Sequence, residues 1–294
     1  MGAVQKLIVV LGPTASGKTA LGLQLARAFK GEIISADSRQ VYRGMDIGTA
    51  KERDTGAVRQ HLVDILDPDE PFSVAEWKRL ALRAAEDIIA RGHLPIVVGG
   101  TGLYIQSLVD NLDIPSITAN QTLRASLAEK SDAELLGLLR RLDPSMLRTI
   151  DARNRRRVIR ALEVMILTGE TWTGKRAHGK PFFDVLQIGI DLPRRELYAR
   201  IDERVRRQID SGLVDEVRHL LKKYPSMLPS LSAIGYREIV CSLSGEITLP
   251  EAIARIQFAT HAYVRRQLTW FRKDKRIKWV KTPEEAENLI LTFF

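Results

Sequence analysis

A glycine-rich loop near the N-terminus constrains the fold of this chain more than any other stretch. Its sequence is GPTASGKT at residues 12–19, which matches the phosphate-binding spacing G-x-x-x-x-G-K-[ST]. An apolar run at 7–11 precedes the loop, and apolar residues at helical spacing follow it at 21, 25 and 29. Because the motif requires this order of strand, loop and helix, we expect an α/β fold with a parallel sheet.

The residue types in this loop suit the binding of two or more phosphates. Glycines let the backbone curl so that several N–H groups point at one anion, and the helix that follows adds the positive end of its dipole. Lys18 supplies a point charge, and the Thr19 hydroxyl is expected to hold Mg²⁺ on the phosphate. The alternative is a glycine-rich turn with no ligand. The residues expected to contact phosphate are Gly12, Thr14, Ala15, Ser16, Gly17, Lys18 and Thr19.

Two further loops follow apolar runs that are typical of buried strands. The run at 32–36 leads into Asp37, and the run at 96–98 leads into a glycine-rich loop that contains Thr101. Since the carboxyl ends of parallel strands open into the ligand crevice, we expect both side chains to face the phosphate loop. Position alone leaves an ordinary turn or capping role open for each of them.

Composition limits the partners and the compartment. The formal net charge of +9 over 294 residues favours an anionic partner, which includes a long polyanion. Cys241 is the single cysteine, so an internal disulfide is excluded and a reducing compartment is expected. No apolar run approaches about 18 residues, and a strand is expected almost at the N-terminus, which leaves no room for a signal peptide. We therefore expect a cytoplasmic protein without a membrane segment, and nothing in the sequence requires more than a monomer.

The alternation of strands and helices stops near Pro115 and resumes near residue 185. The stretch between them has only helical patterns, which indicates an insertion at one edge of the α/β core. The expected division is a P-loop core of 1–114 and 185–294, whose parallel sheet is flanked by helices, and an all-helical insertion of 115–184. Helices are expected within the insertion at 123–129, 132–142 and 152–167.

Two helices carry a large excess of cations. Five arginines lie between residues 153 and 160, with only Asp151 and Glu163 nearby, whereas a solvated helix face normally mixes both signs. A last long helix, expected at 250–273, ends in arginines and lysines interleaved with aromatic residues. This pattern suits phosphates and stacked bases, although the aromatic residues could instead belong to the core. We therefore expect a nucleic-acid surface.

Two classes of function remain. A small-molecule kinase would use ATP, with Asp37 orienting the acceptor hydroxyl. A transferase acting on RNA would use the phosphate loop to hold a diphosphate that leaves. The apolar run at 96–98 ends in Gly99, so it offers no aspartate that could act as the metal-holding carboxylate of a kinase. The cation-rich helices also exceed what a small substrate needs, so the second class is favoured.

An ordered set of motifs over nearly the whole chain resembles the bacterial tRNA dimethylallyltransferases, also called tRNA isopentenyltransferases. Besides the phosphate loop, the set comprises DSRQVY at 37–42, DIGTAK at 46–51, HLVD at 61–64, GGTGLY at 99–104, RRVIRALE at 156–163, GYRE at 235–238 and RQLTWF at 266–271. Departures from the family pattern at His261 and Val264 leave the tRNA contacts of these two positions open. No cysteine-rich zinc-finger tail is present.

The resemblance implies transfer of a dimethylallyl group from dimethylallyl diphosphate to the exocyclic amine of an adenosine. That adenosine lies 3′ of the anticodon in tRNAs that read codons beginning with U. Asp37 would be the general base, Thr101 would help to hold the amine, and Arg204 would add a contact to the diphosphate. The residues that the resemblance implies in tRNA binding are Asp37, Ser38, Arg39, Gln40, Thr101, Arg156, Arg157, Arg160, Gly235, Tyr236, Arg237, Arg265, Arg266, Gln267, Thr269, Trp270 and Arg272.

Overall fold

A parallel sheet forms the centre of the molecule. The computed structural model describes residues 5–115, 117, 119–171 and 179–294. Within these residues, six parallel strands form one sheet in the order β3-β2-β4-β1-β5-β6. The strands are β1 (Lys6–Leu11), β2 (Gly31–Ala36), β3 (Gln60–His61), β4 (Leu94–Gly99), β5 (Asp184–Ile190) and β6 (Lys278–Val280). The inner strands are buried on both faces, which explains their continuous apolar runs and confirms the predicted sheet.

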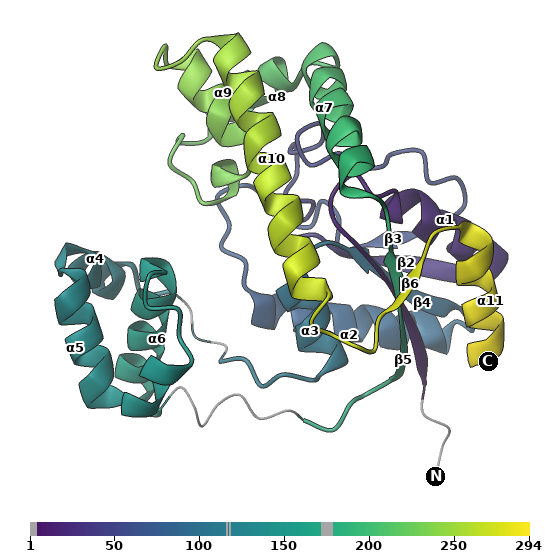
Figure 1. Ribbon diagram of the computed structural model, residues 1–294, viewed down its shortest axis with the longest axis horizontal. Helices are drawn as coiled ribbons and strands as arrows, with labels where there is room; N and C mark the ends of the chain where they lie inside the picture. The colour runs from purple at the N-terminus through teal and green to yellow at the C-terminus, as the bar shows by residue number, and fades with distance from the viewer. Residues whose placement is uncertain (1–4, 116, 118, 172–178) are drawn as a thin grey trace.

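Helices cover both faces of the sheet (Figure 1). Helices α1 (Lys18–Ala28) and α11 (Pro283–Phe293) pack on the face that presents Ile8 and Val10 of β1. Helices α2 (Val74–Ala90) and α3 (Gly102–Val109) pack on the opposite face. Alternate residues of one strand thus belong to two different hydrophobic clusters, as the pleat of a strand requires.

A group of helices forms a cap at the end of the sheet where the strands terminate (Figure 1). They share a third hydrophobic cluster, to which the segment after β2 contributes Val41 and Met45. This cap places α7 and α10 opposite the loops that follow β1 and β2. The cap consists of α7 (Arg194–Asp210), α8 (Leu213–Lys223), η3 (Ser230–Ser232), α9 (Tyr236–Leu243) and α10 (Leu249–Phe271).

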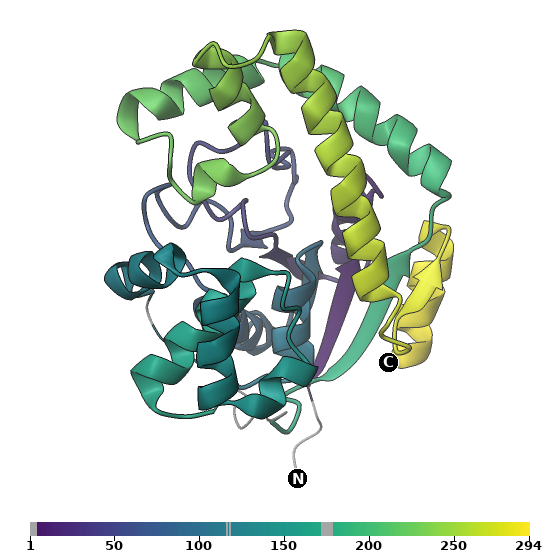
Figure 2. The same cartoon turned by 60° about the vertical axis from the view of Figure 1, so that its left-hand side comes forward.

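The helices between α3 and β5 form a unit that Figure 1 shows apart from the sheet and that lies in front of it in Figure 2. It has a hydrophobic cluster of its own, made by residues such as Leu135, Leu139 and Leu162. The unit consists of α4 (Gln121–Glu129), α5 (Asp132–Leu142), η1 (Pro144–Arg148) and α6 (Arg155–Thr168). Its independence as a domain of 115–184 stays a prediction.

Some element boundaries differ from the sequence expectations. Helix α6 begins at Arg155 instead of residue 152, because the Asn154 side chain caps it by accepting from the Arg157 amide. The segment 52–71, which the sequence predicts to be mostly loop, contains the short strand β3, and the chain continues beyond α10 into β6 and α11. The start of α11 does carry a signal in the sequence: Thr282 caps it, and a proline occupies its first turn.

Candidate active site

The phosphate loop joins β1 to α1 and leaves a buried hydroxyl without a partner. Gly17 adopts a left-handed conformation with φ of 91°, which favours glycine. The Ser16 side chain is buried, and its Oγ has no hydrogen-bond partner among the described residues. A buried hydroxyl without a partner is costly. An anionic oxygen in the loop would satisfy it.

Two cations meet at this loop. The Arg204 Nη1 of α7 donates to the Thr14 Oγ1 at 3.1 Å. Burial, with a smaller contribution from the Arg204 charge, lowers the pKa of Lys18 to about 8, although Asp37 opposes the shift. Burial also lowers the pKa of Arg204. Both cations are therefore less stable here than in water, and a bound anion would offset that cost. The geometry favours an anion site.

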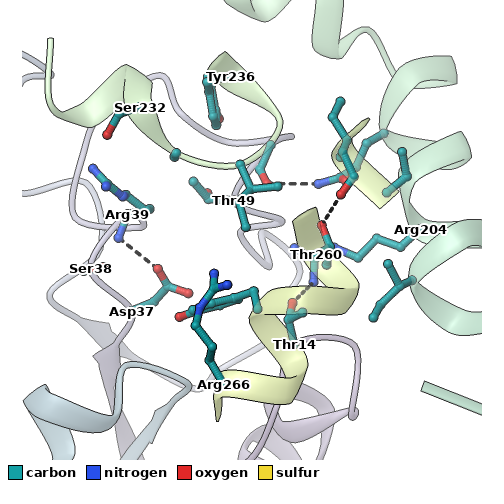
Figure 3. A pocket seen from close by; sticks show the side chains of 18 residues that line it. Thr14, Asp37, Ser38, Arg39, Thr49, Arg204, Ser232, Tyr236, Thr260 and Arg266 are labelled. Atoms are coloured by element: carbon teal, nitrogen blue, oxygen red, sulfur yellow. Dashed lines mark hydrogen bonds between the residues drawn. The ribbon is translucent and has the colours of Figure 1, made fainter. Parts of the chain in front are cut away.

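Asp37 follows β2 and lies beside the same cavity. One carboxylate oxygen, Oδ1, accepts from the Arg39 backbone N–H at 2.8 Å, which is the turn geometry that short acidic residues favour (Figure 3). The Ser38 amide donates to the Thr101 Oγ1 at 3.2 Å, and the Thr101 amide donates to the Ala36 carbonyl at 3.1 Å. Thr101 thereby holds the loop that carries Asp37. Asp37 also lines the cavity, so the turn geometry does not prevent a chemical role.

The cavity between these loops and the helical cap has a volume of about 310 Å³. This is near the lower end of the range for small-ligand sites, roughly 300–1,000 Å³. Thr14, Asp37 and Arg204 contribute polar groups to its lining from different sides (Figure 3), and α7 and α10 contribute the apolar side chains of Ile201, Val205 and Ile256. Its lining comprises Thr14, Asp37, Ser38, Arg39, Gly48, Thr49, Ile201, Arg204, Val205, Gln208, Ser232, Ala233, Ile234, Tyr236, Ile256, Thr260, Tyr263 and Arg266. An anion site and a carboxylate thus border one partly apolar cavity.

Glu216 of α8 fixes one wall of this cavity, and the sequence did not reveal it. Its carboxylate accepts from the backbone N–H groups of residues 46, 47 and 48 at 2.9, 2.7 and 3.2 Å, and from the Tyr236 hydroxyl at 2.6 Å. A Cβ on Gly48 would lie 2.3 Å from the Tyr236 ring, so the wall requires glycine there. Nothing distinguishes Glu216 locally from the other charged residues of an amphipathic helix.

Several residues predicted to contact tRNA make internal contacts. Tyr236 is fully buried against Glu216, and burial raises its pKa, so its side chain is not a surface contact. Gln40 bonds internally to the Ser35 hydroxyl and the Thr49 carbonyl, and the buried Gly235 donates its N–H to Glu238. Gln267 is only 5% exposed. The tRNA contacts of these positions stay predictions.

Other predicted contacts do lie on the surface. Arg265, Arg266, Thr269, Trp270 and Arg272 are exposed along the last turns of α10, and Trp270 is 39% exposed rather than part of the core. Arg266 stacks over the Tyr263 ring, at 5.6 Å from its centroid, and also lines the cavity. Ser38, Arg39 and Arg237 are near the same cap. Of these residues, Ser38, Arg39 and Arg266 line the cavity.

The arginines of α6 divide into two kinds. Arg156 and Arg157 are exposed. Arg160 and Arg124 both pair with the carboxylate of Glu163, which is fully buried, at 2.6 and 2.8 Å. Arg160 therefore stabilises the helical unit, and the cation excess read from the sequence overstates what this helix offers to RNA.

The residues of the phosphate loop suit a magnesium ion only if bound phosphate supplies further ligands. Among the described ranges, no cluster of three or more histidine, cysteine or acidic side chains could hold a metal ion. Thr19, in the first turn of α1 beside Lys18, supplies a single hydroxyl. One protein ligand, with phosphate oxygens and waters, is a usual arrangement for Mg²⁺.

Comparisons with known proteins agree with this geometry. A family model described as IPP transferase matches residues 40–274. A tRNA dimethylallyltransferase of Thermomicrobium roseum is 46% identical over 286 residues, which cover 95% of this chain and 87% of that protein. A tRNA dimethylallyltransferase of Roseiflexus is 47% identical over 290 residues, which cover 96% and 94% of the two chains.

Solved structures give the same result. The tRNA isopentenylpyrophosphate transferase of Bacillus halodurans aligns with a TM-score of 0.74 and 38% identity, over 98% of this chain and 96% of that one. A eukaryotic dimethylallyltransferase acting on tRNA aligns with a TM-score of 0.77 and 28% identity, over 90% of this chain and 69% of that one.

In the part of the chain that the structure describes, no helix has the length and apolar character needed to cross a bilayer.

Proposed function

This chain belongs to the IPP transferase family, and we propose that it transfers a dimethylallyl group from dimethylallyl diphosphate to an adenosine of tRNA. The acceptor in this proposal is the exocyclic amine of the adenosine 3′ of the anticodon, in tRNAs that read codons beginning with U. The observation that carries the proposal is the placement of the Ser16, Lys18 and Arg204 anion site and the Asp37 carboxylate beside one cavity.

The anion site is suited to a leaving diphosphate. The bond between C1 of the prenyl group and the diphosphate oxygen breaks while the bond between C1 and the adenine nitrogen forms. Negative charge then grows on the diphosphate, and Lys18 and Arg204 lie where they can neutralise it. The Ser16 hydroxyl, which has no hydrogen-bond partner within the described part of the chain, supplies a further donor. The apolar wall formed by Ile201, Val205 and Ile256 suits a five-carbon chain.

Asp37 is suited to deprotonating the amine. An adenine amine is a weak nucleophile, so the proton that it loses must be accepted as the new bond forms. The Oδ1 atom of Asp37 is held by the Arg39 amide, which fixes the orientation of the carboxylate beside the cavity. The Thr101 hydroxyl accepts from Ser38 and keeps its own proton to donate, which suits a role in holding the acceptor base.

Magnesium would be held by the Thr19 hydroxyl together with the donor phosphates. When bound, it would neutralise charge on the departing diphosphate. The site residues Gly12, Thr14, Ala15 and Gly17 would shape the backbone around the phosphates.

Recognition of tRNA would use the exposed end of α10, together with Ser38, Arg39 and Arg237. The target base must leave the anticodon-loop stack, which costs roughly a few kcal/mol, and phosphate contacts would offset that cost. Arg156 and Arg157 would add contacts from a helical domain of 115–184. We further propose a monomer acting in the cytoplasm, where its tRNA substrate is found.

Incubation with unmodified tRNA and a labelled donor tests this function. Labelled dimethylallyl diphosphate should transfer its label to RNA, whereas ATP labelled in its γ-phosphate should transfer none. Transfer of phosphate from ATP to a small acceptor, without any prenylation of RNA, would instead identify a kinase.

A further inference from the structure

Gln267 joins the two halves of the site from within α10. Its Oε1 accepts from the Thr14 backbone N–H at 2.9 Å, and its Nε2 donates to the Gly100 carbonyl at 2.9 Å. Thr14 belongs to the loop after β1, and Gly100 belongs to the loop after β4. The amide thus spans the phosphate loop and the loop that carries Thr101.

The surroundings of Gln267 leave little room for another arrangement. A Cβ on Gly100 would lie 2.4 Å from the Gln267 Nε2, so a side chain at position 100 would displace the Gln267 amide from this arrangement. The same added atom would lie 3.4 Å from the Gly12 carbonyl oxygen and 3.6 Å from the Lys18 Cε. The two loops and the amide are therefore packed together at one point.

Each hydrogen bond of Gln267 continues into the proposed machinery. Thr14, whose amide is held by Gln267, accepts from Arg204 through its hydroxyl, so the bridge helps to position that guanidinium. On the other side, Thr101 follows Gly100 directly and accepts from the Ser38 amide next to Asp37. The neighbouring Arg266 on α10 lines the cavity.

From this geometry we infer that Gln267 is a positioning residue for prenyl transfer, which sets the spacing between the diphosphate site and the acceptor site. The inference rests on the function proposed above. It replaces the expected tRNA contact of Gln267 with an internal bridge. It also assigns the Thr14 N–H to the bridge instead of to the bound phosphate.

The variants Gln267→Met and Gln267→Glu separate this role from packing and from RNA contact. Methionine keeps the shape and removes both hydrogen bonds, so kcat/KM for dimethylallyl diphosphate should fall about ten- to hundredfold, while the Kd for tRNA stays within about twofold. Gln257→Met, the same substitution on the same helix away from both loops, is the matched control and should change neither value.

The Gln267→Glu variant adds a pH-dependent activity measurement that a change in packing alone would not alter. An ionised carboxylate accepts from Thr14 but cannot donate to Gly100, and it repels the diphosphate. A protonated carboxyl restores both hydrogen bonds. The activity of this variant relative to the native enzyme should therefore rise as the pH falls from about 8 to about 5.5, whereas the relative activity of Gln267→Met should stay constant.

The outcomes are distinct. A flat relative pH profile for Gln267→Glu, or a Gln267→Met variant with native kcat/KM and tenfold weaker tRNA binding, would overturn the bridge. If Gln267→Met fails to fold, reactivation of Gln267→Glu by acid decides the question alone. If the native enzyme itself transfers no prenyl group, the proposed function fails, and the bridge is then tested by the loss of inorganic diphosphate binding in Gln267→Met.

Discussion

Replacement of Asp37 by asparagine tests the proposed general base without disturbing the turn. The asparagine carbonyl can still accept from the Arg39 N–H, which now binds Oδ1 at 2.8 Å, so the loop should keep its conformation. The variant loses the proton acceptor. General-base catalysis contributes typically 10²- to 10⁴-fold, so kcat should fall at least about a hundredfold. The Kd for tRNA should change by less than about twofold, since the exposed cations on α10 are untouched.

The assay is single-turnover transfer of labelled dimethylallyl to saturating unmodified tRNA, with tRNA affinity measured separately by filter binding. Asp191→Asn is a matched control, because Asp191 also follows a strand of the sheet but does not line the cavity. It should keep the native kcat. Asp37→Ala should lower activity at least as much as Asp37→Asn, because it also removes the turn hydrogen bond. Weak tRNA binding with a native rate at saturation would refute the role of Asp37 as base.

Three further predictions concern charge. The pKa of Lys18 is lowered to about 8 and its protonated form binds the anion, so kcat/KM for dimethylallyl diphosphate should fall as the pH rises through about 8. Lys18→Arg should abolish this fall, and a fall that persists in Lys18→Arg would contradict the assignment. Replacing Arg265 and Arg266 by alanine should weaken tRNA binding and reduce the salt slope of log Kd by about 1 to 2; an unchanged slope would remove both from the interface. Glu163→Ala should lower the free energy of unfolding, measured by urea titration, by about 2 kcal/mol, because it leaves the partly exposed Arg124 and Arg160 without their shared buried carboxylate. Glu129→Ala, on an exposed face, should change the free energy of unfolding little.

The sequence predicted the parts of the fold that depend on local signals. The phosphate loop follows a continuous apolar strand, and the loops with Asp37 and Thr101 follow two more, so their meeting at one sheet edge could be expected from parallel topology alone. The short edge strands β3 and β6 could not be predicted, because two or three residues carry no reliable periodicity of apolar residues.

The internal contacts of Gln267 and Tyr236 could not be predicted, because they join residues far apart in the chain. The family resemblance implied tRNA binding for Gln267 and Tyr236. Their partners, Thr14 and Glu216, are brought to them only by the packing of the helical cap on the sheet. The pairing of Arg160 with the buried Glu163 is different, because the two residues are three positions apart on α6 and helical spacing alone allows the contact.

The most direct test of the account is the location of the product on the RNA. Unmodified tRNA is incubated with the enzyme and dimethylallyl diphosphate, digested to fragments and then to nucleosides, and analysed by mass spectrometry. The account predicts one added C5H8 unit, carried by the exocyclic amine of the adenosine 3′ of the anticodon. An unmodified adenosine at that position, with ATP hydrolysed or its phosphate transferred instead, would contradict it.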